Sequence, residues 1–208
     1  MNLQVKNPKS GWRGSEDVWL EAAYEILISA GVDAVKVMPL AQNLGLSRTS
    51  FYHHFDSREA LLTALINRWE QKNTGNLIKR TESFAETITE AIFNLFDCWI
   101  DADLFDARLD FAIRNWAQSA PDLKERTERA DQYRINAITA MFRRFDYTEG
   151  QAETRARTLY YTQVGYISMM VQEPLELRVA KMPTYIETFS GVAASPSEIN
   201  RFRARHGV

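Results

Sequence analysis

The chain has 208 residues, of which 45% are hydrophobic and 25% are charged, and its formal net charge is −2. This composition is typical of a soluble globular protein, and the negative net charge argues against indiscriminate binding to nucleic acid. The single cysteine, Cys98, excludes an intramolecular disulfide bond and a cysteine-rich zinc site. No apolar run approaches the roughly 18 residues of a membrane span, and the first residues lack the apolar core of a signal peptide. We therefore expect a soluble, cytoplasmic protein with no membrane association.

The charge is distributed unevenly along the chain. Residues 1–80 carry a formal charge of +2 and the remainder carries −4. This mild asymmetry favours a local phosphate-contacting surface near the N-terminus over a generally basic protein. Lys6, Lys9 and Arg13 could form an arm that touches DNA phosphates, or could equally belong to a solvated tail.

Helical periodicity dominates the sequence, and no alternating pattern predicts a strand. Ser15, followed by two acidic residues, predicts the start of a helix, because its hydroxyl can cap the helix and acids suit the first turn. Gly31 ends that helix, and Ser57 begins another, whose apolar face fades near Gly75. Further amphipathic helices are expected over about residues 84–99, 105–119, 121–145 and 149–172, and a capping box at residues 195–198 begins a last one. The sequence therefore predicts an all-α fold.

Residues 36–66 have the pattern of two short helices joined by a turn. Ala41 is small where the two helices would approach each other, and Gly45 can adopt the positive φ that ends the first helix. Ser47 can cap the second helix. We therefore predict a three-helix head with a helix-turn-helix over residues 1–60, followed by a larger helical body over residues 61–208.

The second helix of this motif has two different faces. At about 100° per residue, Phe51 and Phe55 lie on the same side and should pack inward. Thr49, Tyr52 and His53 fall on the opposite side, with Ser50 at its edge, and Arg48 at the helix start can swing its long side chain toward a groove. This face therefore offers hydroxyl, imidazole, phenol and guanidinium groups with almost no aliphatic surface. These groups suit base edges and phosphates of DNA. Arg58, in the first turn of the next helix, opposes the helix dipole unless a phosphate binds there.

The segment LAQNLGLSRTSFYHHFDSREALL resembles the DNA-binding motif of the tetracycline-repressor (TetR) family of transcription regulators. The matching residues are Leu40, Ala41, Gly45, Ser47, Tyr52, His54, Phe55, Arg58, Glu59, Leu61 and Leu62. The resemblance covers about residues 15–66, and beyond them it rests on length and helical content alone. Three features depart from the family pattern. Lys36 and Val37 stand where the family often has threonine, Pro39 sits early in the first helix of the motif, where the first turn tolerates proline, and Arg58 replaces the more usual lysine.

The resemblance implies a homodimer whose two heads enter successive major grooves of a palindromic double-stranded DNA operator. It further implies that a small-molecule effector of unknown identity binds in the body and releases a repressor from that operator. The residues expected to contact DNA are Lys36, Ser47, Arg48, Thr49, Ser50, Tyr52, His53 and Arg58.

The body offers candidates for a ligand pocket and for a dimer interface, although most of its aromatic residues should simply form the core. The candidate pocket residues are Trp99, Phe105, Phe111, Arg114, Trp116, Tyr160 and Tyr166, with Arg114 contacting an acidic ligand unless it forms a surface salt bridge. The candidate interface residues are Ile138, Met141, Phe142, Phe145, Leu159, Ile167 and Met170, in two helices that could pair across a two-fold axis or bury these faces within one subunit.

The main alternative function is a helical protein that binds a small molecule or lipid and keeps this fold without binding DNA. The polar face of the second helix argues against it, because such a protein has no need to keep aliphatic side chains off that face. No phosphate loop, nucleophile elbow or metal-ligand spacing supports an enzyme, a cofactor or a metal site, and His53 and His54 point about 100° apart.

Overall fold

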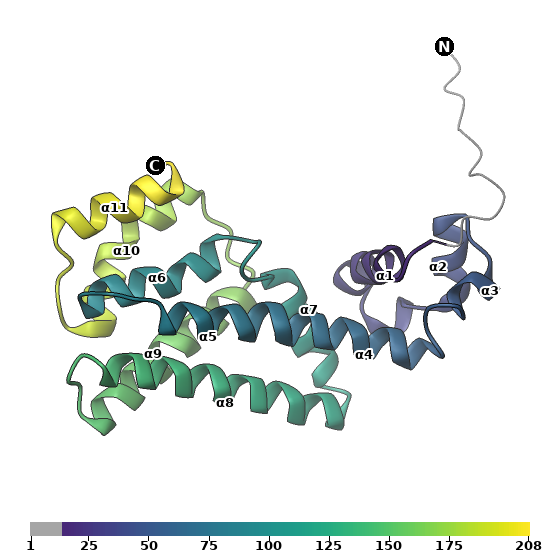
Figure 1. The fold of residues 1–208 in the computed structure, drawn as a ribbon, viewed down its shortest axis with the longest axis horizontal. Coiled ribbons are helices and arrows are strands. Elements are labelled where there is room, and N and C mark those ends of the chain that lie inside the picture. The colour runs from purple at the N-terminus through teal and green to yellow at the C-terminus, as the bar shows by residue number, and fades with distance from the viewer. Residues whose placement is uncertain (1–13) are drawn as a thin grey trace, which may run out of the picture. The chain divides into compact units, whose positions relative to one another are not determined.

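The structure, a computed structural model, describes residues 14–208. Within this range the chain forms eleven α-helices and no strand, which confirms the predicted all-α class (Figure 1). The chain divides into two compact units, one ending at Asn67 and the other beginning at Arg68. The division expected after residue 60 lies in the same helix. None of the helices between residues 14 and 208 is long and apolar enough to cross a bilayer.

The N-terminal unit begins with a helix whose start agrees with the sequence. The Ser15 side chain accepts a hydrogen bond from the Val18 N–H, and Gly31 follows the helix with φ +80°. The elements of this unit are α1 (Glu16–Ala30), the 3₁₀ turn η1 (Val32–Ala34), α2 (Val37–Leu44), α3 (Arg48–Phe51) and the first part of α4 (Arg58–Trp69). Trp19, Leu40, Phe51 and Leu61 are fully buried and form its core.

The helix that begins at Arg58 is longer than the sequence suggested. A π-helical turn, η2 (Glu70–Thr74), follows α4, and α5 (Gly75–Glu82) continues directly from it. Gly75 has helical backbone angles, so the expected fading near this residue was wrong. The apolar pattern is hard to follow here because Asn73 and Thr74, which are polar, are buried in the turn.

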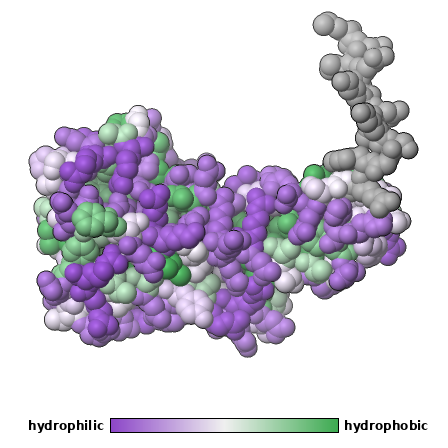
Figure 2. All heavy atoms as spheres, viewed as in Figure 1, coloured by the Kyte–Doolittle hydropathy of each residue, from purple (hydrophilic) through white to green (hydrophobic). Residues whose placement is uncertain are grey.

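The second unit contains the remaining helices. These are α6 (Ile88–Ile100), α7 (Ala107–Ala117), α8 (Pro121–Arg143), α9 (Glu149–Ser168), α10 (Leu175–Ser190) and α11 (Pro196–His206). Side-chain caps begin several of them: Thr87 caps α6, Asp106 caps α7 and Ser195 caps α11 in the expected capping box. The sequence pattern did not reveal α10, which has Pro183 in its interior. In the view of Figure 2 the surface is mostly hydrophilic, with small hydrophobic areas between polar ones.

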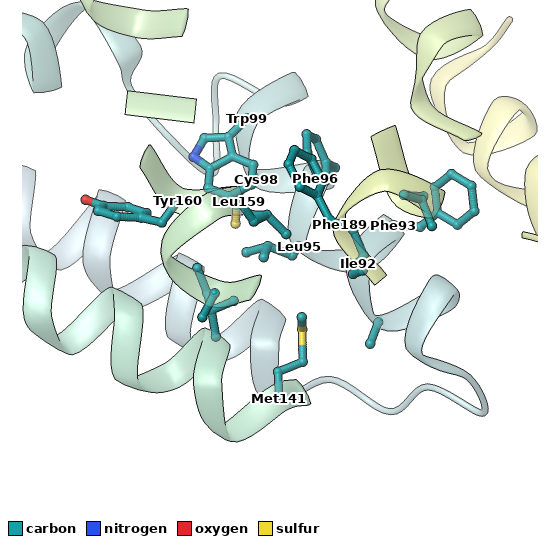
Figure 3. Packing of buried hydrophobic residues seen from close by; sticks show 14 of the residues in the cluster. Ile92, Phe93, Leu95, Phe96, Cys98, Trp99, Met141, Leu159, Tyr160 and Phe189 are labelled. Carbon is teal, nitrogen blue, oxygen red and sulfur yellow. The ribbon is translucent and has the colours of Figure 1, made fainter. Parts of the chain in front are cut away.

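The core of the second unit lies between α6, α8, α9 and α10. Figure 3 shows side chains of α6, such as Leu95 and Phe96, packed with Met141 of α8, Leu159 of α9 and Phe189 of α10. This packing corrects the candidate dimer interface, because most of its members are already buried inside one subunit. Ile138, Met141, Phe142 and Leu159 are 0% exposed, Ile167 is 8% exposed and Phe145 is partly buried against the core. Met170 alone of the seven is largely exposed.

Candidate functional sites

The turn between α2 and α3 has the geometry that its sequence predicts. Gly45 adopts φ +64° and ψ +27°, and its N–H bonds to the carbonyls of Ala41 and Gln42. The Leu46 N–H bonds to the Ala41 carbonyl at 2.9 Å, which closes the end of α2. The Ser47 hydroxyl then accepts a hydrogen bond from the Ser50 N–H at 3.1 Å and caps α3. These local bonds fix the helix-turn-helix.

Phe51 anchors α3 to the core of the N-terminal unit. Its ring meets Trp19 edge-on at 5.3 Å and stacks on Phe55 at 5.6 Å. Phe51 is 0% exposed and Phe55 is 6% exposed, which confirms that both point inward. Because Trp19 belongs to α1, this aromatic cluster sets how α3 lies on the first helix and therefore which residues of α3 face solvent.

The exposed side of α3 and of the turn that follows it presents the polar side chains that the helical wheel placed there. Arg48, Thr49, Tyr52 and His53 are all exposed. The Arg48 guanidinium lies over the Tyr52 ring, 5.5 Å from its centroid, and its Nη2 donates to the Tyr52 hydroxyl at 3.3 Å. This contact pre-orients a cation and a phenol side by side, which suits recognition of a base edge next to a phosphate. Lys36 and Ser47 are also exposed, at the starts of α2 and α3.

Two of the expected DNA-contact residues are placed differently. Ser50 is 5% exposed, so its side chain lies on the inner face of α3 and not at the edge of the outer face. The Arg58 guanidinium donates to the carbonyls of Val35 at 2.6 Å and Val32 at 2.7 Å. The sequence suggested that a bound phosphate would offset the unfavourable interaction between the Arg58 charge and the helix dipole. In the structure these two backbone carbonyls accept hydrogen bonds from the guanidinium instead.

The exposed surface also includes residues outside the predicted set. Gln42 and Asn43 on α2 are exposed and carry carboxamides, groups that bind adenine edges or phosphates. The wheel of the second helix did not consider them because they belong to the first. No group of three or more potential metal ligands occurs among residues 14–208. The possible arm of Lys6, Lys9 and Arg13 lies outside the described residues.

The comparison with known families agrees with this geometry. Residues 20–65 match the model of the tetR family of bacterial regulatory proteins. The matched segment spans most of α1, all of α2 and α3, and the first part of α4. No curated protein matches its sequence significantly.

Solved structures extend the likeness from the motif to the overall fold. Mycobacterium smegmatis AmtR is 16% identical with a TM-score of 0.65, covering 97% of this chain and 99% of its own. Salmonella enterica GusR is 15% identical with a TM-score of 0.59 (95% and 98%). A TetR-family transcriptional regulator from Mesorhizobium loti is 15% identical with a TM-score of 0.57 (96% and 98%). Identities this low establish the shared fold alone.

The body of the chain contains a buried ion cluster at the π turn. Asp110 is 1% exposed and accepts hydrogen bonds from Trp69 Nε1 (2.7 Å), Arg114 Nε (2.7 Å) and Arg134 Nη1 (3.0 Å). Arg134 is 0% exposed, and its Nε donates to the Thr74 hydroxyl at 2.9 Å. Three separate segments, η2 with the end of α4, α7 and α8, are therefore joined by charged groups inside the protein.

Two further groups complete this ion cluster. Arg114 binds both carboxylate oxygens of Asp131, at 2.6 and 2.9 Å, and the Tyr160 hydroxyl donates to Asp131 at 2.6 Å. Burial disfavours the charged form of Asp110, but the guanidinium groups of Arg134 and Arg114 outweigh burial and lower its pKa from 3.8 to about 2. Burial is also the main cause that raises the pKa of Tyr160. Two arginines and two aspartates balance in charge, whereas the buried Arg134 Nη2 has no hydrogen-bond partner within residues 14–208.

A separate cavity lies between α6, α9 and α10. Its lining includes Phe96 and Ile100 of α6, Gln163 and Tyr166 of α9, and Phe189 of α10. Of the seven candidate pocket residues, Tyr166 lies in the lining of this cavity. Arg114 and Tyr160 belong to the ion cluster, Trp99 and Phe105 are buried in the core, and Phe111 and Trp116 are partly buried on α7. The expected contact between Arg114 and an acidic ligand is replaced by its salt bridge with Asp131.

Proposed function

We propose that this DNA-binding transcriptional regulator is a repressor that leaves a palindromic operator when a small molecule binds its body. The exposed face of α3 is the observation that supports operator binding. Arg48, Thr49, Tyr52 and His53 lie together there, while Phe51 holds the helix on the core from the other side. A protein that only bound small molecules would gain nothing from keeping this face polar. The repressor acts in the cytoplasm, where the operator is, and carries no enzymatic activity.

The exposed residues divide by what they can reach. Arg48 and Thr49 read base edges, because arginine pairs bidentately with guanine and the threonine methyl contacts thymine. Tyr52, His53, Lys36 and Ser47 bind phosphates and set the position of α3 in the groove. Ser50 and Arg58 take no part, because Ser50 is buried and the Arg58 guanidinium is occupied by backbone carbonyls.

The repressor is a homodimer joined through α9 and α10. Five large apolar side chains on or just after these helices are more than 40% exposed: Tyr161, Met169, Met170, Leu177 and Tyr185. Exposed apolar groups concentrated on two adjacent helices favour a helical interface between copies. Met169→Lys is therefore expected to convert a dimer into a monomer in size-exclusion chromatography with light scattering. Phe84→Lys, which changes another exposed apolar residue, should leave the dimer intact, and a chain that is monomeric before any substitution would contradict this interface.

Selection of bound sequences from a random duplex library, at near-physiological salt, tests operator binding. We expect a palindrome whose half-sites lie about 34–36 Å apart or a multiple of this spacing. Arg48→Ala should change the preferred base at one position of each half-site, whereas Tyr52→Phe should weaken binding to all sequences about equally. Arg203→Ala removes the same charge from an exposed position of α11 and should change neither. If the folded, dimeric protein enriches no sequence, the proposal is refuted. That result would favour a helical protein that binds a small molecule or lipid and does not bind DNA.

A further inference from the structure

The cavity between α6, α9 and α10 is lined by a polar side chain that forms no hydrogen bond within residues 14–208. Gln163 of α9 is 8% exposed, and its side-chain amide has no hydrogen-bond partner within residues 14–208. Its amide atoms are not fully enclosed by protein, so water or a bound molecule can form hydrogen bonds with them. The amide belongs to the cavity lining, where a bound molecule can reach it.

Among the charged groups at the same cavity, Arg178 is left without an ion pair within residues 14–208. Glu173 forms an ion pair with Lys181, and it accepts a hydrogen bond from the Tyr166 hydroxyl at 3.3 Å. Arg178 lies over the Tyr166 ring at 5.2 Å and donates to the carbonyl of Trp99 at 3.0 Å, but it has no carboxylate within ion-pair distance in the described chain. Glu173 and Arg178 are thus the charged residues of the lining, and since Lys181 outside the lining pairs with Glu173, the Arg178 guanidinium is the group to which an anion can bind.

The remaining walls are aromatic and flat. Phe96 and Phe189, which lie near each other in Figure 3, stack with their ring centroids 6.2 Å apart, and Tyr185 also stacks on Phe189, at 5.9 Å. Leu159 and Met182 complete the apolar part of the lining. Such walls suit a planar hydrocarbon group, because offset stacking and burial of apolar area both stabilise it.

We propose that this cavity binds a small aromatic carboxylate, with the carboxylate on Arg178 and the Gln163 amide and the ring among Phe96, Tyr185 and Phe189. The arginine supplies charge-assisted hydrogen bonds and the amide supplies a neutral donor to the same group. The assignment of this ligand as the effector rests on the proposed function, whereas its binding does not.

The cavity must widen to admit a ring. Its free volume is about 40 Å³, room for about three water molecules. The outer wall is α10, which contributes Arg178, Met182, Tyr185 and Phe189. Pro183 lies inside this helix and removes one of its backbone hydrogen bonds, so α10 bends most easily at this point. Because the proposed dimer face also includes α10, a ligand that displaces this helix acts on the packing of the two copies.

The proposal is tested by measuring the binding of benzoate to the protein in the absence of DNA, with calorimetry and ligand-observed NMR. For so small a probe we expect a Kd of about 0.1–1 mM. Benzamide has the same shape without the charge and should bind about tenfold more weakly. Arg178→Met should weaken benzoate binding about tenfold, and Gln163→Leu should weaken it several-fold while leaving the fold intact. Arg203→Met and Gln172→Leu make the same changes at exposed positions outside the lining and should bind benzoate as the unmodified chain does.

Failure to reach saturation below about 10 mM benzoate would overturn the proposal, as would equal affinity for benzamide or equal binding by all four variants. The outcome is separable from that of the operator selection. If benzoate binds and no operator is found, the site stands and the proposed function fails. If an operator is found and benzoate does not bind, the ligand assignment alone fails.

Discussion

The substitution Asp110→Asn tests how strongly the buried ion cluster holds the body together. The change keeps the size of the side chain and an oxygen that can accept from Trp69 Nε1. It removes the negative charge that contacts both Arg114 and Arg134. Arg134, which is 0% exposed, would keep only the Thr74 and Tyr160 hydroxyls as hydrogen-bond partners. A cation would thus remain in the core with no compensating charge in contact.

The expected cost follows from this burial. Removing one partner of a buried ion pair typically lowers the free energy of unfolding by about 3–5 kcal/mol, because the other charge remains desolvated. Asp131→Asn is the matched control, since Asp131 is 28% exposed and its partner Arg114 is 17% exposed. Solvent can replace part of that interaction, so we expect this control to cost about 1 kcal/mol.

The double variant Asp110→Asn with Arg134→Met separates the charge effect from simple loss of packing. Removing both charges should restore part of the stability that Asp110→Asn loses, because no unpaired charge then remains in the core. Urea unfolding followed by circular dichroism, at one fixed protein concentration, measures all three variants. A loss below about 1 kcal/mol for Asp110→Asn, or a double variant less stable than the single one, would refute the reasoning.

The lowered pKa of Asp110 predicts that the stability lost in this variant depends on pH. The folded-state pKa of Asp110 is lowered from 3.8 to about 2, so its contribution to stability is fully present above about pH 4. That contribution is lost as the pH falls from about 4 towards 2, where the folded protein must also bind the proton. The stability difference between the unmodified chain and Asp110→Asn should therefore be constant near neutral pH and shrink in this acidic range.

Three further substitutions or reactions follow from local geometry. Gly45→Ala should lower the free energy of unfolding by about 1 kcal/mol through backbone strain alone, since φ is +64° and no atom lies within 4 Å of the added Cβ; Gly45→Asn should cost less in the same thermal melt. Arg58→Met should lower the melting temperature of the DNA-free protein, because the bonds to Val32 and Val35 are lost; an unchanged melting temperature with weaker DNA binding would instead identify a phosphate contact. Burial raises the pKa of the Cys98 thiol to about 12, so a disulfide reagent at pH 8 should modify it only after unfolding, and rapid reaction of the folded protein would contradict its burial.

The features that the sequence predicts best are those fixed by neighbouring residues. Gly45, Ser47 and the Phe51–Phe55 pair lie as predicted because a positive φ, a cap and a four-residue spacing act within one turn. Helix α10 was missed for a local reason too. Its N-cap is Pro174, which offers no capping side chain, and Pro183 interrupts its pattern.

The features that escaped prediction depend on contacts between distant segments. A helical wheel assigned Ser50 to an exposed edge, but packing of α3 on the rest of the head buries it. The sequence offered Arg114 either for contact with an acidic ligand or for a surface salt bridge. It could not name the salt-bridge partner, because Asp131 lies in another helix. Arg134 was not recognised at all, because arginine is normally exposed and nothing near it in sequence marks it as buried. The residues that line the cavity, such as Gln163 and Tyr166, likewise could not be separated from core residues, because which side chains border the cavity depends on how α6, α9 and α10 pack.

The π turn η2 affects how this chain should be aligned with its relatives. Trp69, Asn73, Leu77 and Thr81 are all buried at intervals of four residues. In an uninterrupted α-helix such a series would rotate about 40° at each step and leave the core, so the wider turn at Glu70–Thr74 keeps it in phase. A relative with a regular α-helix here would need one residue fewer. An alignment without a gap at this turn would then shift every later position by one residue, about 100° around each helix, and would equate buried residues with exposed ones.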